Sequence, residues 1–179
     1  MNAEKVEDNQ EINNDSTEVE KEDEVIAEET IVQLVSFNLS NDVEYGINIL
    51  SVHEILKTSE IARLPNTPSF IKGVINLRGK IIPVIDVRKR FGFSAVKITD
   101  LTRVIIVQLD EKLVGLMVDN VNQVVRIPTN SIDSPNELIK GVSEEFICGV
   151  GRLEDRLIVI LKLSSVLLLE PEVDGKISK

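Results

Sequence analysis

The sequence predicts a mainly β protein with two related five-stranded barrels and a few short helices, preceded by a disordered acidic tail. Three observations predict this class. Beyond residue 30 the chain consists of short β-branched runs separated by polar turns, which is typical of small antiparallel sheets or barrels. Glycines and apolar positions recur in the same order in the two halves of the chain. The first 30 residues, in contrast, are highly charged and hold few large apolar side chains.

The excess negative charge is concentrated in residues 1–30. This segment holds 12 Asp and Glu and 2 Lys, a net charge of 2 − 12 = −10, so 20 − 2 = 18 basic and 30 − 12 = 18 acidic residues remain elsewhere. Apolar burial cannot offset the entropy of ordering such a segment, so we expect a disordered spacer there and a flexible end at 171–179. The remainder of the chain has a net charge near zero and therefore no dominant positive field, and the chain has no tryptophan, so nucleic acid is not an expected partner.

Seven apolar runs are the strand candidates: 32–39, 45–49, 73–77, 80–85, 103–109, 113–118 and 156–162. Helices are expected to be few and short. Ser51 and Glu54 have the spacing of a capping box, Asp86 is placed to cap a helix over 87–91, and Ser164 or Ser165 could begin a last helix that Pro171 ends.

An internal duplication is the most informative feature. Three segment pairs align without gaps: 70–87 with 146–163 (offset 146 − 70 = 76), 45–57 with 114–126 (offset 114 − 45 = 69) and 34–39 with 104–109 (offset 104 − 34 = 70). The glycines match as well, Gly46 with Gly115 and Gly73 with Gly149. We therefore assign a first barrel to about 31–100 and a second to about 101–170, with a possible exchange of strands between them.

Residues able to support catalysis are scarce. The only histidine, His53, lies beside Glu54 in the predicted helical turn, and no second group is evident to activate it. The only cysteine, Cys148, can make neither an internal disulfide nor a cysteine-based zinc site. We expect no enzymatic activity, no cofactor and no metal. The lack of a long apolar run predicts no direct membrane insertion, and the cytoplasm is the expected compartment.

The two halves differ at one predicted turn. The first has Asn-Leu-Arg-Gly-Lys at 76–80 where the second has Arg-Leu-Glu-Asp-Arg at 152–156. An arginine beside a glycine at a tight turn is exposed, so the Arg78 guanidinium could address a carboxylate or carbonyl group of a partner. Alternatively, Gly79 only supplies an unusual φ and Arg78 is an ordinary solvated charge. The residues alone do not decide between the two.

The first half carries a distinctive run of motifs: Tyr-Gly-Ile at 45–47, Ile-Leu at 49–50, Val52, Glu-Ile at 54–55, Asn-Thr-Pro at 66–68, Phe-Ile-Lys-Gly-Val at 70–74, Asn-Leu-Arg-Gly at 76–79 and Pro-Val-Ile-Asp-Val-Arg at 83–88. This run resembles the signature of the family of chemotaxis coupling proteins known as CheW. Weaker motifs at 114–115, 118–119 and 149–151 extend the resemblance over about 32–169. The regulatory domain of the histidine kinase CheA and CheV-type proteins share the main block, but they carry further kinase or receiver domains.

The resemblance implies two SH3-like barrels that act as a non-enzymatic adaptor in the cytoplasm. Its partners would be the cytoplasmic hairpin tip of a chemoreceptor and the regulatory domain of CheA, and it would be recruited to membrane-associated receptor arrays. It would support receptor control of the kinase and needs no cofactor. A kinase-type enzyme would require a nucleotide loop, and a binder of proline-rich peptides an aromatic groove, which five Phe, one Tyr and no Trp do not favour.

Equivalent faces of two related barrels tend to meet, so we expect Ile49 and Val52 to lie near Val118 and Val121. Such an apolar trough suits a helical hairpin. The same residues could instead only hold the two barrels together. The candidate receptor- or kinase-binding residues are Ile49, Val52, Glu54, Ile55, Gly73, Arg78, Gly79, Val114, Gly115, Val118 and Val121.

Overall fold

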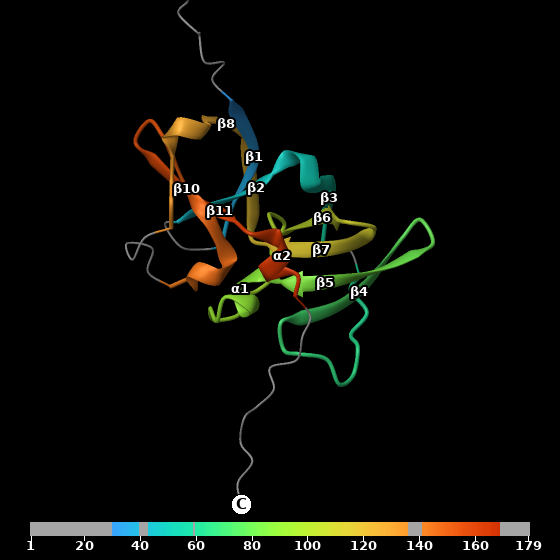
Figure 1. Cartoon of the computed structure of the whole chain (residues 1–179). Helices are drawn as coiled ribbons and strands as arrows, with labels where there is room; N and C mark the ends of the chain where they lie inside the picture. The colour runs from blue at the N-terminus through green and yellow to red at the C-terminus, as the bar shows by residue number, and fades with distance from the viewer. Residues whose placement is uncertain (1–29, 40–42, 59, 136–140, 169–179) are drawn as a thin grey trace, which may run out of the picture.

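Two β-sheets make up most of the computed structural model, which describes residues 30–39, 43–58, 60–135 and 141–168 (Figure 1). The strands are β1 (Ile31–Asn38), β2 (Glu44–Asn48), β3 (Val52–Lys57), β4 (Ile71–Leu77), β5 (Lys80–Asp86), β6 (Arg103–Leu109), β7 (Lys112–Val118), β8 (Asn120–Pro128), β9 (Ile132–Asp133), β10 (Ile147–Leu153) and β11 (Arg156–Leu161). The helices are α1 (Val87–Arg90) and α2 (Leu163–Val166), with single 3-10 turns η1 (Ile49–Ser51), η2 (Thr129–Ser131) and η3 (Glu144–Phe146).

The two sheets repeat one strand order. Sheet A runs β8-β1-β2-β11-β10-β9 and sheet B runs β3-β6-β7-β5-β4. In the sequence duplication β6, β7, β8, β10 and β11 are the counterparts of β1, β2, β3, β4 and β5. Equivalent strands therefore occupy equivalent places, and the short β9 is an addition to sheet A. The predicted mainly β fold with two related five-stranded units is confirmed.

The two halves of the chain exchange their first hairpins. In sheet A the hairpin β1–β2 lies between β8 and β11, and in sheet B the hairpin β6–β7 lies between β3 and β5. Both junctions are parallel pairs, with Tyr45 opposite Val159 and Leu116 opposite Ile85. A division near residue 100 therefore does not separate the sheets, because each sheet contains strands from both halves.

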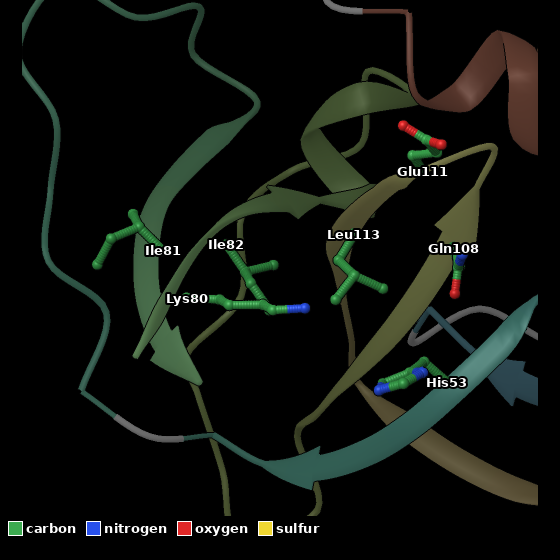
Figure 2. A pocket seen from close by; sticks show the side chains of 7 residues that line it. All are labelled: His53, Lys80, Ile81, Ile82, Gln108, Glu111 and Leu113. Carbon is green, nitrogen blue, oxygen red and sulfur yellow. The ribbon is translucent and has the colours of Figure 1, made fainter. Parts of the chain in front are cut away.

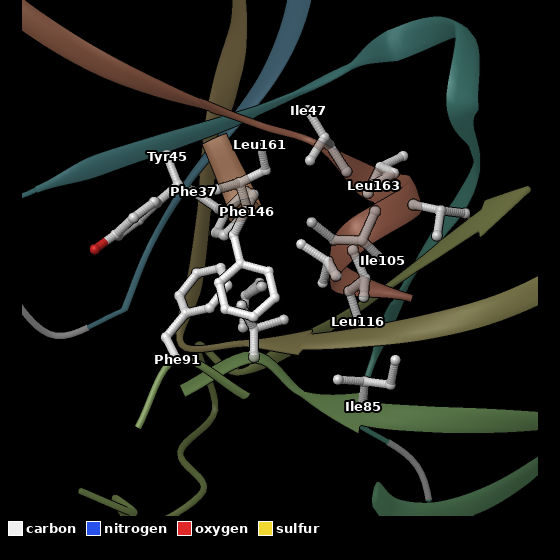
Figure 3. Close-up of a cluster of buried hydrophobic side chains, with 14 of the residues drawn as sticks. Phe37, Tyr45, Ile47, Ile85, Phe91, Ile105, Leu116, Phe146, Leu161 and Leu163 are labelled. Atoms are coloured by element: carbon white, nitrogen blue, oxygen red, sulfur yellow. The ribbon is translucent and has the colours of Figure 1, made fainter. Parts of the chain in front are cut away.

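Three hydrophobic clusters fill the structure, one inside each sheet and one between them. Val104 and Ile106 point into the cluster of sheet B, whereas their neighbours Ile105 and Val107 point into the central cluster. This explains why residues 104–107 of β6 are an uninterrupted apolar run, since this part of the strand is buried on both faces. Figure 3 shows the central cluster, where Ile85, Ile105 and Leu116 of sheet B meet Phe37, Tyr45, Ile47 and Leu161 of sheet A.

The helix predicted after Ser51 is wrong. Residues 52–57 form strand β3, in which half-buried and exposed side chains alternate. Two β-branched residues, Val52 and Ile55, favour the strand. Glu54 had suggested a capping box, but its carboxylate pairs with Arg78 instead. His53 therefore lies on a strand and not on a helical turn.

The other two helix predictions are partly right. The Asp86 side chain caps α1 by accepting a hydrogen bond from the Lys89 N–H at 3.3 Å, as predicted. The helix is one residue shorter than expected and ends at Arg90. The final helix begins at Leu163, before the two serines, and the predicted stop at Pro171 lies outside the described residues.

An ion pair links the neighbouring strands β2 and β11 of sheet A. Arg156 Nη2 donates to Glu44 Oε1 at 2.5 Å and to Oε2 at 2.7 Å, and Arg156 Nε donates to Oε2 at 3.0 Å. Burial alone would raise the pKa of Glu44, but hydrogen bonds from Arg156, Ser36 and Asn122 and the guanidinium charge hold that pKa below its ordinary value. The pair thus fastens the exchanged hairpin β1–β2 to the second half.

Glu44→Gln is expected to lower the free energy of unfolding by about 1 to 2 kcal/mol at pH 7, because a charge-assisted hydrogen bond is lost. The folded-state pKa of Glu44 is depressed, so this stabilisation is present above the unfolded value of about 4.3 and is lost as the pH falls through the folded pKa. Urea unfolding at neutral and acidic pH measures the difference, with exposed Glu145→Gln as the control. Equal stability of Glu44→Gln and the parent chain at pH 7 would contradict this assignment.

Candidate partner-binding site

An exposed apolar residue marks the edge between the two sheets. Asn48 Oδ1 accepts a hydrogen bond from the Leu50 N–H at 2.9 Å, which caps the turn η1. The turn leaves Leu50 90% exposed, while Ile49 and Val52 are half-buried and pack against the central cluster. Leu50 is the most exposed large apolar side chain among the described residues, and together with Ile49 and Val52 beside it forms a candidate protein contact.

The four residues of the predicted trough all belong to one cluster but differ in accessibility. Val118 is buried in the centre, whereas Ile49, Val52 and Val121 are half-buried and pack against the cluster from outside. Val121 lies on β8 opposite Phe37 of β1. The three half-buried residues keep surface that a partner could contact, whereas Val118 is only 1% exposed.

Three other predicted site residues have structural roles. Val114 is buried in the central cluster. A Cβ on Gly115 would lie 2.8 Å from Val104 Cγ1, and a Cβ on Gly73 would lie 2.2 Å from the carbonyl oxygen of Ala62. Val114 and Val118 are only 6% and 1% exposed. Of the four residues expected to form the trough, Val118 thus fits the alternative in which they hold the two sheets together, because it is buried in the cluster between the sheets. Gly115 instead faces the cluster inside sheet B.

The turn between β4 and β5 has two successive residues with positive φ. Arg78 has φ 51° and Gly79 has φ 85°, between the paired residues Leu77 and Lys80. This is the twist that two-residue hairpin turns require. The Asn76 side chain accepts a hydrogen bond from the Gly79 N–H at 2.9 Å. Gly79 thus supplies an unusual φ, which was one part of the alternative in which Arg78 is only a solvated charge.

The same turn places Arg78 against strand β3. The Arg78 side chain is 76% exposed, and its Nη2 donates to Glu54 Oε2 at 3.2 Å. The other carboxylate oxygen, Glu54 Oε1, is buried and has no hydrogen bond to any described residue. His53 Nε2 lies 3.9 Å from it, beyond hydrogen-bond distance. An exposed guanidinium and an unsatisfied acceptor therefore lie side by side, while neighbouring Ile55 is 41% exposed.

Leu50 was missed by sequence reasoning, although a signal existed. In a strand, successive side chains point to opposite faces, so the adjacent apolar pair Ile49 and Leu50 cannot both enter one core.

The described part of the chain shows neither a metal cluster nor a membrane span. No group of three or more His, Cys, Asp or Glu there could hold a metal ion. Among the same residues, no helix has the length and hydropathy to cross a bilayer.

The two-sheet fold and the sequence together identify the family. The sequence model of the CheW-like domain matches residues 33–170, and the chain belongs to this family. The match spans both sheets and the turn that presents Arg78.

Related proteins match most of this chain in sequence. The chain is 37% identical over 146 residues to the chemotaxis protein CheW of Klebsiella aerogenes, covering 81% of this chain and 87% of the relative. It is 34% identical over 139 residues to chemotaxis protein CheW of Helicobacter pylori, covering 78% and 83%. The crystal structure of the scaffolding protein TtCheW from Thermoanaerobacter tengcongensis aligns with a TM-score of 0.73 and 40% identity, covering 82% of this chain and 97% of that one.

Proposed function

We propose that this chain is a non-enzymatic chemotaxis adaptor that couples chemoreceptors to the histidine kinase CheA. One partner is the cytoplasmic hairpin tip of the receptor and the other is the regulatory domain of the kinase. The adaptor acts in the cytoplasm and is recruited to membrane-associated receptor arrays, where it supports receptor control of kinase activity.

The observation that carries this proposal is the extent of the family match. The alignment with the solved scaffolding protein TtCheW covers 82% of this chain and 97% of that one. A function built on both sheets is therefore expected to be shared. Relatives in several bacteria are named chemotaxis protein CheW, which supports a role of this chain in chemotaxis.

The exposed groups suit two protein partners and no chemical reaction. Leu50, with Ile49 and Val52 beside it, offers an apolar edge to the ridge of a helical hairpin. Arg78, whose side chain is 76% exposed, offers a guanidinium for polar contacts. An adaptor of this kind needs no bond-making group, because holding two partners together raises their effective concentration.

Assembly tests the proposal directly. A receptor signalling fragment and the regulatory domain of CheA should each bind the purified chain in calorimetry, and the three should co-sediment as one complex. Binding of neither partner would reject the adaptor function. Saturable binding of ATP would argue for an enzyme instead.

Leu50→Glu is expected to weaken receptor binding by about 1 to 3 kcal/mol, because a charge replaces an apolar contact at the interface. The folding stability should change by less than about 0.5 kcal/mol, since the side chain is 90% exposed. Leu157→Glu is the matched control, because Leu157 is 61% exposed on β11, outside the proposed contact. Equal losses of receptor binding in both variants would show that Leu50 has no special place in the contact.

A further inference from the structure

A pocket of about 250 Å³ opens at one end of sheet B. Figure 2 shows its lining, which comes from β3, β5, β6, β7 and the turn before β7: His53, Lys80, Ile81, Ile82, Gln108, Glu111 and Leu113. The Lys80 ammonium points into the space beside Leu113, while Glu111 lies at the edge of the pocket. None of the candidate residues predicted from the sequence lies in this lining.

The duplication provides a reference for this pocket in sheet A. Offsets of 76 and 69 match Lys80 with Arg156, Leu113 with Glu44 and His53 with Asn122. In sheet A these three groups form a closed network. Arg156 holds both oxygens of Glu44, and Asn122 Nδ2 donates to Glu44 Oε1 at 3.2 Å. A carboxylate thus fills the place that is open in sheet B.

Sheet B lacks this carboxylate. Leu113 stands where sheet A has Glu44, and Lys80 makes no ion pair within 4 Å to any residue that the structure describes. The cation is thus retained at this position without its internal partner. An ammonium beside an apolar side chain in a small pocket suits a carboxylate brought in from outside.

We propose that this pocket binds an aspartate or glutamate side chain from the chemoreceptor hairpin tip, in the place that Glu44 fills in sheet A. The proposal rests on the adaptor function proposed above. The receptor is the chosen source because β3, which carries His53, begins directly after η1 and the proposed receptor contact at Leu50. His53 shares the outer face of β3 with the exposed Ile55, and Lys80 follows the turn that carries Arg78.

Leu113→Glu is the decisive variant, because it supplies the missing carboxylate from within. The new side chain should pair with Lys80 as Glu44 pairs with Arg156 and so exclude the receptor carboxylate. The Kd for the receptor fragment is expected to rise about tenfold or more, while the Kd for the CheA regulatory domain stays within about twofold. Leu113→Gln, which has the same shape without the charge, should raise the receptor Kd less.

Lys80→Gln is the second variant and does not depend on how glutamate at 113 is accommodated. It should raise the receptor Kd about tenfold by removing the ammonium, whereas Lys80→Arg should retain most of the affinity. Both should keep the melting temperature of the parent chain, because Lys80 is exposed.

The outcomes separate this inference from the proposed function. If the parent chain binds neither partner, the adaptor function itself fails. If the parent binds the receptor and Lys80→Gln binds it equally well, the carboxylate pocket is rejected and the adaptor function stands. A loss confined to kinase binding also rejects it, because the pocket would then serve the other partner. Should Leu113→Glu fail to fold, the Lys80 pair alone decides.

Discussion

Gly73→Ala is expected to destabilise the protein by about 3 kcal/mol or more, because two costs add at this position. The backbone of Gly73 has φ 148°, which side chains rarely adopt, and its added Cβ would lie 2.2 Å from the Ala62 carbonyl oxygen. Ala62 is held there by a two-way backbone bridge to Val74, so it cannot retreat without breaking hydrogen bonds. Urea unfolding monitored by circular dichroism measures the loss.

Gly79→Ala is the matched control for this substitution. Gly79 also has a positive φ, 85°, but a Cβ there would meet nothing within 4 Å. Only the backbone strain remains, so the expected cost is about 1 to 2 kcal/mol. If both variants lost the same stability, close contact with Ala62 would not be the reason for glycine at 73.

Arg78→Ala is expected to weaken the receptor–kinase assembly by about 2 to 4 kcal/mol, if its guanidinium makes a charge-assisted contact to a partner. The same substitution should change the folding stability by less than about 1 kcal/mol, because the side chain is 76% exposed and its pair with Glu54 lies near water. Denaturant unfolding and co-assembly should be measured on the same variant. A strongly destabilised protein, or unchanged assembly, would reject the role of Arg78 as a contact residue.

Two further substitutions at Arg78 sharpen the test. Arg78→Lys should restore assembly only in part, because an ammonium cannot reproduce a two-pronged hydrogen bond. Arg78→Gly should fold at least as well as the parent chain, since φ 51° is a strained backbone conformation for arginine but not for glycine. A variant that folds better and assembles worse would show that the fold does not require this arginine.

The two related sheets could be predicted because the duplication preserves glycines at positions where the fold has no room for a side chain. Gly73 and Gly149 each lie against a crossing backbone, that of Ala62 in one sheet and Asp133 in the other. Their spacing could therefore be read from the sequence. The exchange of hairpins could not, because β1–β2 and β6–β7 are equivalent and bury the same faces in either arrangement.

The site was predictable only where a turn determined exposure. Asn76, Arg78 and Gly79 indicated a hairpin turn, and the structure places all three there. Val114 and Val118 were apolar residues on a strand, and the sequence could not say that both faces of that strand would be buried. The open pocket at Lys80 becomes visible only when its counterpart, the Glu44–Arg156 pair, is seen in three dimensions.

Because the hairpins are exchanged, the first hairpin of the chain cannot complete its sheet until the second half has been synthesised. The first hairpin to leave the ribosome pairs with strands made much later: Leu34 lies opposite Val125, 125 − 34 = 91 residues on, and Tyr45 opposite Val159, 159 − 45 = 114 residues on. At about 5 to 20 residues per second, β11 is synthesised roughly 6 to 23 s after β2. Throughout that delay its apolar side chains and unpaired edges face other nascent chains, so crowded translation or concentrated refolding favours dimers in which two molecules trade hairpins.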